Sequence, residues 1–319
     1  KKSPKCNALL ESDEEYQNSE QLFYYFVDRF SKILEDRNIV TAGWEEIGLV
    51  KSHNEEGDIK VDLNEDFNER GFAPYVWNTV WSWGDEDRGY KLANAGFKVV
   101  LSNVSNNYFD LAYDKDPSDP GYYWGGFVDT RKAWEFAPLN VYAEPLTNRD
   151  GVRLNVKEDF RDHVRLTEKG KANIQGIQGQ LWAETVKGNQ MLEYYIFPKM
   201  LGLVERAWAK DPVWTSVEED SIRFDFLNKD WDQFASRIGN FELPRLTYLN
   251  GGVNYRVAPP GVEVKKGVLH VNTNYPGAKF TYTTDGTEPT FESAQYSSPV
   301  AISGEEVKVI AFYPNGEKS

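Results

Sequence analysis

Apolar residues follow a helical spacing in three parts of the chain. Over residues 18–36 they recur every three or four positions with charged residues between them, which predicts an amphipathic helix. Similar spacing predicts helices over 85–95, closed by Gly96, and over 190–209. Short runs of β-branched and aromatic residues between the helices predict four strands, at 39–44, 75–81, 97–102 and 174–182.

The alternation of these elements predicts a parallel sheet, because strands joined by helices pair in the same direction. Four strand–helix units correspond to half of a (β/α)8 barrel. We expect the strand at 39–44 to be buried, and the segment 105–170 to be mainly loop. Half a barrel has two open strand edges, and no initiator methionine precedes Lys1. We therefore expect the chain to be part of a longer polypeptide.

The pattern changes near residue 245. Beyond Pro259-Pro260 only short alternating runs occur, at residues 262–264, 268–271, 280–283 and 307–312. Asp285-Gly286 and Asn315-Gly316 are turn dipeptides. The fold predicted is therefore α/β, a C-terminal barrel half over residues 1–245, followed by a small all-β, immunoglobulin-like sandwich over 246–319.

Composition excludes several classes of function. Fifty acidic and 36 basic residues give a net charge of −14, which repels nucleic acid and anionic lipid. No apolar run is long enough for a membrane-spanning segment. The single cysteine and the three isolated histidines predict no disulfide framework and no metal site. Aromatic residues reach 14%, which suits a carbohydrate site, because sugar C–H faces stack on rings.

An aromatic residue with a polar neighbour stands at or just beyond the end of each expected strand, where barrel enzymes place their chemistry. Residues two apart on a strand share a face. Trp182 and Glu184 would therefore present a ring beside a hydroxyl acceptor, and so would Tyr108 and Asp110. One tryptophan at such a position is usually core, but four aromatic residues at successive strand ends favour a sugar-binding site.

These motifs resemble glycoside hydrolase family 20, the β-N-acetylhexosaminidases, and the bacterial chitobiases in particular. The similarity covers nearly the whole chain. It is carried by Ser3-Pro4-Lys5-Cys6, Trp44, Trp77, Asn107-Tyr108-Phe109-Asp110, Gly179-Gln180-Leu181-Trp182-Ala183-Glu184 and Glu205-Arg206-Ala207-Trp208. The segment Tyr282–Thr290 resembles the small β domain at the chitobiase C-terminus.

The resemblance implies a role for each motif residue. Three tryptophans would line the pocket for the terminal N-acetylglucosamine: Trp44, Trp77 and Trp182. Tyr108 would bond the oxygen of the 2-acetamido group, and Asp110 and Glu184 would bind the distal hydroxyls. Trp124 would be a platform for the second sugar; a loop tryptophan packed on the barrel rim is its alternative explanation.

The resemblance implies a retaining, substrate-assisted mechanism: the acetamido carbonyl attacks the anomeric carbon, an Asp orients it, and the adjacent Glu is the general acid. Such a mechanism requires no metal or cofactor. In the family this Asp-Glu pair lies shortly before the Ser-Pro-x-Cys segment, so we place it upstream of Lys1. Asp13-Glu14 follows no strand, and Asp85-Glu86 resembles the acidic first turn of a helix. The chain alone is therefore expected to be inactive.

The resemblance implies that the chain is part of an exo-β-N-acetylglucosaminidase acting on chitobiose and other N-acetylglucosamine-terminated oligosaccharides. Its partner would be the N-terminal half of the same enzyme, and its location the bacterial envelope or the medium. Two alternatives stay open. One is a non-catalytic carbohydrate-binding fragment. The other is a glycosidase of another family that pairs Glu184 with Asp110 or Glu46, for which a carboxyl separation of ~5–5.5 Å would indicate a retaining enzyme.

Overall fold

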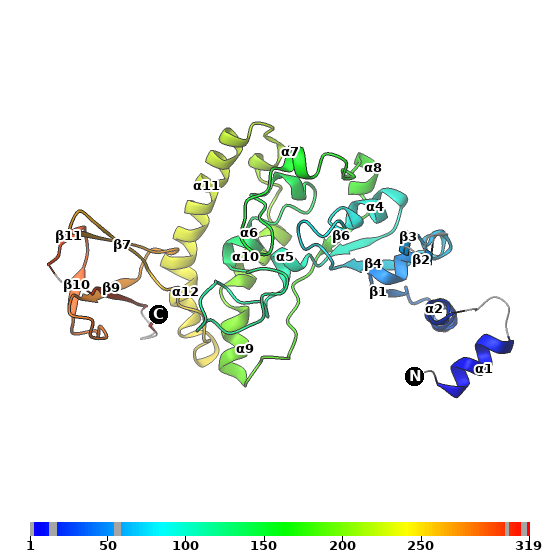
Figure 1. The fold of residues 1–319 in the computed structure, drawn as a ribbon, viewed down its shortest axis with the longest axis horizontal. Helices are drawn as coiled ribbons and strands as arrows, with labels where there is room; N and C mark the ends of the chain where they lie inside the picture. The colour runs from blue at the N-terminus through cyan, green and yellow to red at the C-terminus, as the bar shows by residue number, and fades with distance from the viewer. Residues whose placement is uncertain (1–2, 13–17, 54–58, 304–305, 314–317) are drawn as a thin grey trace. The chain divides into compact units, whose positions relative to one another are not determined.

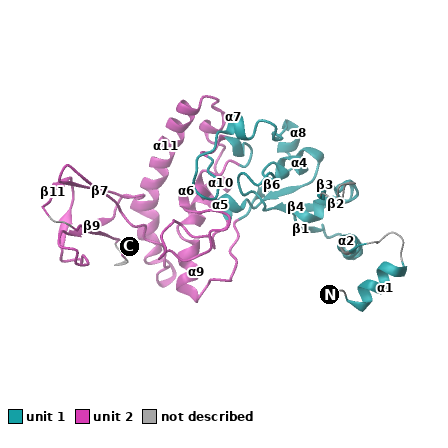
Figure 2. Ribbon diagram, viewed as in Figure 1, with its two compact units in different colours: residues 1–107, 138–142, 146–178 teal, residues 108–137, 143–145, 179–319 magenta. Residues whose placement is uncertain are grey.

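The computed structural model describes residues 3–12, 18–53, 59–303, 306–313 and 318–319. The chain forms two compact units, coloured teal and magenta in Figure 2. Unit 1 comprises residues 1–107, 138–142 and 146–178. Unit 2 comprises residues 108–137, 143–145 and 179–319.

Unit 1 is built on a parallel four-stranded sheet in the order β1-β4-β5-β6 (Figure 1). Its strands are β1 (Ala42–Trp44), β4 (Ala73–Val76), β5 (Val99–Leu101) and β6 (Ile174–Ile177). Helix α4 (Arg88–Ala95) connects β4 to β5. Two parallel strands joined by a helix are the repeating unit of a (β/α)8 barrel. The predicted fold class is confirmed.

Two helices of unit 1 have clear caps, one at its N-terminus and the other at its C-terminus. Helix α2 (Ser19–Glu35) starts after Asn18, whose side chain accepts hydrogen bonds from the backbone nitrogens of Glu20 and Gln21, each at 3.0 Å. Helix α4 ends at Gly96, whose φ of +119° lies in the left-handed region that glycine adopts without strain. Helix α2 agrees with the prediction, whereas α4 ends where it was predicted to end but begins at Arg88, three residues later than predicted.

The expectation of a buried first strand was wrong. Ile39 and Val40, just before β1, are 49% and 66% exposed, and Trp44 is half-buried. Among the described residues β1 pairs with β4 alone, so one edge of the strand is open. The physical reason is that a β-branched run predicts a strand, but burial depends on what covers it.

Three other parts of unit 1 differ from the prediction or extend it. The second strand ends at Val76, because the next two backbone nitrogens bond the Glu45 carboxylate. The polar stretch after Trp44 holds a hairpin and a short helix that the sequence did not predict: β2 (Leu49–His53), β3 (Ile59–Leu63) and α3 (Glu65–Glu69). As expected, the segment 105–170, which contributes to both units, is mainly loop; its short helices are α5 (Val104–Asn107), α7 (Val156–Asp159) and α8 (Glu168–Lys171) in unit 1, and α6 (Thr130–Trp134) in unit 2.

Unit 2 contains four further helices: α9 (Asn189–Ile196), α10 (Lys199–Trp208), α11 (Asp220–Arg237) and α12 (Leu243–Leu246). The single helix predicted over 190–209 is two helices, because Pro198 has no N–H to donate to the preceding turn. Helix α11 was not predicted. No described helix is both long and apolar enough to cross a membrane.

The C-terminal part of unit 2 is a small β domain of two antiparallel three-stranded sheets, β10-β9-β12 and β11-β8-β7. Its strands are β7 (Gly261–Lys265), β8 (Val268–Asn272), β9 (Lys279–Thr283), β10 (Ala294–Tyr296), β11 (Val300–Ala301) and β12 (Lys308–Phe312). The predicted sandwich is confirmed, although β10 and β11 were not predicted. Asp285-Gly286 forms a turn after β9, whereas Asn315-Gly316 lies outside the described residues.

One hydrophobic core joins the helices of unit 2 to its β domain. Trp134, Leu227 and Trp231 from the helices pack in the same cluster as Tyr275 and Tyr313. Trp134 and Trp231 meet edge to face, with ring centroids 5.3 Å apart. Residues on both sides of position 245 therefore belong to a single packed unit.

Candidate functional site

Unit 2 brings three of the predicted residues together in an aromatic cluster. The ring of Tyr108 lies 6.1 Å from that of Trp124 and 6.3 Å from that of Trp182, both edge to face. Tyr108 is 3% exposed and Trp182 39% exposed. The phenol is thus packed against two indoles, while the partly exposed indole of Trp182 offers a surface on which a ligand can stack.

Backbone hydrogen bonds join the two sequence motifs that carry these rings. Phe109 donates its backbone N–H to the carbonyl of Gln180 at 2.7 Å, and Tyr108 and Gln180 form a parallel bridge. The backbone N–H of Trp182 donates to Oδ1 of Asp110 at 3.2 Å. Asn-Tyr-x-Asp and Trp-x-Glu are therefore neighbours in space, as a shared site requires.

Two carboxylates accompany the cluster. Asp110 is 3% exposed, and burial raises the pKa of its carboxyl; the N–H of Trp182 lowers it, and the negative charge of Glu184 raises it further. Glu184 itself is exposed. The site thus combines a stacking surface with hydroxyl acceptors, one buried and one facing solvent.

A buried lysine supports this cluster, and sequence reasoning missed it. The Lys199 ammonium, 0% exposed, donates to the carbonyls of Phe109 at 2.9 Å and Leu111 at 2.7 Å, which flank Asp110. It also lies 3.7 Å from the ring centroid of Tyr113. Burial holds the pKa of Lys199 well below its usual range. No sequence signal marks such a residue, because lysine is rarely buried.

The two remaining tryptophans, Trp44 and Trp77, belong to unit 1. The ring of Trp44 lies edge to face with Tyr75 at 6.4 Å, and Nε1 of Trp77 donates to Oε1 of Glu46 at 3.4 Å. Both indoles are half-buried. The candidate residues that the structure brings together in unit 2 are Tyr108, Asp110, Trp124 and Trp182. Glu184 is close enough for its negative charge to raise the pKa of Asp110.

Glu45 fixes the backbone that carries Trp77. It is 1% exposed, pairs with Arg88, and accepts the backbone N–H groups of Trp77 at 2.9 Å and Asn78 at 3.1 Å. Burial raises the pKa of Glu45, against the opposing charge of Arg88. Its oxygens are therefore engaged in holding the end of β4.

The dipeptide Asp85-Glu86 has structural partners. Asp85 pairs with Arg88, and Glu86, 4% exposed, accepts the backbone N–H of Trp83 at 2.8 Å. Both residues precede α4, whose N-cap is Asp87, so the expectation that they form the first turn of the helix was wrong. Asp13-Glu14 lies outside the described residues. The described part of the chain holds no cluster of three or more residues suited to a metal ion.

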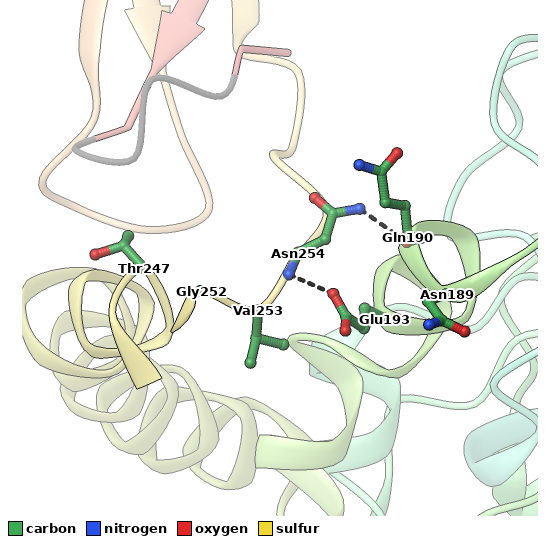
Figure 3. A pocket seen from close by; sticks show the side chains of 7 residues that line it. All are labelled: Asn189, Gln190, Glu193, Thr247, Gly252, Val253 and Asn254. Atoms are coloured by element: carbon green, nitrogen blue, oxygen red, sulfur yellow. Dashed lines mark hydrogen bonds between the residues drawn. The ribbon is translucent and has the colours of Figure 1, made fainter. Parts of the chain in front are cut away.

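A polar pocket of about 390 Å³ lies elsewhere in unit 2 (Figure 3). It is lined by Asn189, Gln190, Glu193, Thr247, Gly252, Val253 and Asn254. Asn254 donates its backbone N–H to Glu193 at 2.7 Å and its side-chain amide to the carbonyl of Gln190 at 2.8 Å. None of the residues predicted from the sequence lines this pocket.

Comparison with known proteins gives a consistent answer. Residues 1–211 match the catalytic domain of glycosyl hydrolase family 20, and residues 242–319 match the chitobiase/beta-hexosaminidase C-terminal domain. A beta-hexosaminidase from Vibrio vulnificus is 30% identical over 89% of this chain and 33% of its own length. An N,N'-diacetylchitobiase from Vibrio harveyi is 30% identical over 89% of this chain and 31% of its own length.

Solved structures show the same relationship. An inactive variant of a family 20 exo-β-N-acetylglucosaminidase from Vibrio harveyi superposes with a TM-score of 0.54 at 26% identity, over 80% of this chain and 30% of that one. The chain spans about a third of the length of the curated relatives it matches. Because the catalytic-domain match extends over most of its residues, the chain belongs to glycosyl hydrolase family 20.

Proposed function

We propose that the chain supplies the sugar pocket of an exo-β-N-acetylglucosaminidase that removes terminal N-acetylglucosamine from chitobiose and chitooligosaccharides. The observation that carries this proposal is the cluster of Tyr108, Trp124 and Trp182, with Asp110 bonded to the backbone of Trp182. A ring beside a directional acceptor suits a pyranose, which has an apolar face and a polar edge. Relatives named beta-hexosaminidase and N,N'-diacetylchitobiase support the substrate class.

Each site residue takes the role that its environment allows. Trp182 stacks on the terminal sugar, and Asp110 and Glu184 accept its distal hydroxyls. Trp124 carries the second sugar. For Trp44 and Trp77, which belong to unit 1, a part in lining the pocket stays a prediction from the sequence.

The mechanism we propose uses the substrate as its own nucleophile. The 2-acetamido carbonyl oxygen attacks the anomeric carbon, the glycosidic C–O bond breaks, and the leaving oxygen takes a proton from a general-acid Glu. Water then opens the cyclic intermediate with net retention. Tyr108 hydrogen-bonds the acetamido oxygen. Because its ring is buried and packs edge to face against the indoles of Trp124 and Trp182, the phenol has little freedom to move, which favours this near-attack geometry.

We place the general acid and its Asp partner in a segment upstream of this chain. Both side-chain amide atoms of Asn107 and the Oδ1 of Asn103 are buried without a hydrogen-bond partner among the described residues. Buried amides are nearly always paired, so groups from such a segment would satisfy them. On α2, Phe26 and Ile33 are 63% and 51% exposed, which gives the same segment an apolar surface to cover.

Tyr108→Phe in the longer polypeptide tests the role of this phenol. We expect kcat on an aryl N-acetylglucosaminide to fall by about 10- to 100-fold with little change in KM, because the hydrogen bond acts as the acetamido group attacks. Tyr122→Phe is the matched control, since Tyr122 is 49% exposed in a neighbouring loop, and should leave both constants unchanged. A rise in KM alone would contradict the proposed role.

A further inference from the structure

A buried arginine lies in the segment that leads from the helices of unit 2 into its β domain. We define the entry segment as residues 252–258. Arg256 is 7% exposed, and its backbone N–H donates to the carbonyl of Phe197 at 3.0 Å. Asn254 ties the same segment to α9 through Glu193 and Gln190 (Figure 3). The entry segment is therefore fixed to the helices at two successive points.

The guanidinium of Arg256 donates hydrogen bonds from two nitrogens to the carboxylate of Asp119, which lies far away in the sequence. Nη2 lies 2.8 Å from Oδ2 of Asp119, and Nε lies 3.3 Å from Oδ1. The Asp119 side chain is 4% exposed, and Oδ1 also accepts the hydroxyl of Tyr194. The guanidinium lies 4.7 Å from the ring centroid of Tyr113. A buried, bidentate ion pair of this kind restricts both side chains to one geometry.

Asp119 belongs to the loop that carries Trp124, residues 110–128. The base of this loop is closed by its own backbone, because Ala112 donates to the carbonyl of Tyr122 at 2.8 Å and accepts from Val128 at 3.0 Å. Gly121 allows this close approach: at its φ of +120°, a Cβ would lie 2.7 Å from Ala112 N. Asp119 anchors the rest of the loop, two residues before Gly121.

We infer that Arg256 and Asp119 are positioning residues for the second-sugar platform. By holding the 110–128 loop, the entry segment sets where the indole of Trp124 lies, so the junction with the β domain contributes to the binding of disaccharides. This inference rests on the proposed function, since it needs Trp124 to contact the second sugar. It assigns to the junction a part in substrate selection that is separate from the terminal-sugar pocket.

The test compares two constants in the longer polypeptide that includes the upstream segment. The KM for chitobiose depends on both sugars, whereas the competitive inhibition constant of N-acetylglucosamine reports the terminal-sugar pocket. For Arg256→Met we expect the KM for chitobiose to rise about five- to tenfold, the effect of losing one aromatic contact. The inhibition constant of N-acetylglucosamine should change less than about twofold on the same scale.

Three variants control this test. Arg223→Met removes an equally buried arginine, 7% exposed and paired with Asp220 on α11, and should leave both constants unchanged. Asp119→Asn should raise the KM for chitobiose as Arg256→Met does, and the double variant should be no worse than either single one. Arg256→Lys keeps the charge but not the two parallel bonds, so it should shift the KM in the same direction even if the methionine variant fails to fold.

Four results would overturn the inference. One is an equal rise in both constants for Arg256→Met or Arg256→Lys, which would indicate a general loss of structure. Another is a selective effect of Arg223→Met. If the unaltered polypeptide neither hydrolyses chitobiose nor binds N-acetylglucosamine, the proposed function fails as well. A polypeptide that does both but shows no selective effect of the Arg256 variants retains the proposed function and contradicts only the inference.

Discussion

Helices α2 and α11 are almost equal in length, 17 and 18 residues, but differ in what covers them. Helix α11 buries Leu227 and Trp231 in the core of unit 2. Helix α2 leaves Phe26, Phe30 and Ile33 about half exposed or more. Since an amphipathic helix is stabilised mainly by packing its apolar face, unit 2 is a self-contained region and unit 1 an open one.

The difference extends to the site. In unit 2 the aromatic cluster is supported by Lys199 and Asp110 from within the same unit. In unit 1 the buried amide of Asn107 lacks a partner among the described residues. The aromatic cluster of unit 2 is therefore already formed, whereas we expect the region around Asn107 to be completed by the upstream segment proposed above.

The largest expected effect is on the core of unit 2. Trp231→Ala should lower the free energy of unfolding by about 3–5 kcal/mol, because it leaves a large cavity beside Trp134 and Phe234. Phe226→Ala on the same helix is the control; Phe226 is 42% exposed, so the loss should be far smaller. Urea unfolding followed by tryptophan fluorescence measures both, and equal losses would contradict a closed core in unit 2.

The second effect concerns the site. Trp182→Ala in the longer polypeptide should lower kcat/KM on an aryl N-acetylglucosaminide. The fall should correspond to a loss of about 2–4 kcal/mol of transition-state binding, because several sugar contacts are lost together. Trp208→Ala is the control, a tryptophan 87% exposed on α10. An unchanged kcat/KM for Trp182→Ala would reject the sugar-binding assignment.

Glu184→Gln separates the proposed function from a glycosidase of another family. If Glu184 binds a sugar hydroxyl, the amide retains an acceptor and kcat should fall by about tenfold or less. A catalytic carboxylate would instead cost several orders of magnitude, and added azide would restore part of the rate. That second pattern would contradict the role proposed here.

A smaller effect tests the open face of unit 1. Phe26→Ala should change the stability of this chain by about 0.5 kcal/mol or less, since the ring is 63% exposed. In the longer polypeptide the same change should cost about 2 kcal/mol or more, because the upstream segment would bury the ring. Equal effects in the two proteins would show that the upstream segment does not cover α2, which would contradict the proposed difference between the two units.

The smallest effect is a shift with pH. Burial, reinforced by the charge of Glu184, raises the pKa of Asp110. Its ionised form accepts hydroxyls, so binding of N-acetylglucosamine should weaken as pH falls through a value above that of an ordinary aspartate. Glu184→Gln removes one raising charge and should move this acid limb to lower pH. A limb that stays in place, or moves to higher pH, would contradict the assignment.

The sequence predicted the elements whose apolar residues show one clear period. Helix α2 and the glycine end of α4 were found in this way. Helix α11 was missed because apolar residues such as Ile222 and Phe226 lie on its exposed side and blur the pattern. The β2–β3 hairpin was missed because β3 is almost wholly exposed and has no buried face to alternate with.

The site divides in the same way. The sequence singled out Tyr108, Asp110, Trp182 and Glu184 as candidates, because aromatic and acidic residues two apart at a strand end predict a sugar site. Lys199 and Arg256 were not singled out, because their burial depends on tertiary contacts with carbonyls and with Asp119 that no local spacing encodes. Motif residues can therefore be recognised from their spacing in the sequence, whereas the buried residues that hold them in place cannot.

The account depends most on the claim that this chain binds the sugar while a preceding segment supplies the proton donor. The direct test is the rate of chitobiose hydrolysis by this chain and by the longer polypeptide, at concentrations where both bind N-acetylglucosamine. We predict binding by both and release of N-acetylglucosamine from chitobiose by the longer polypeptide alone. Hydrolysis by this chain at a comparable rate would contradict the account.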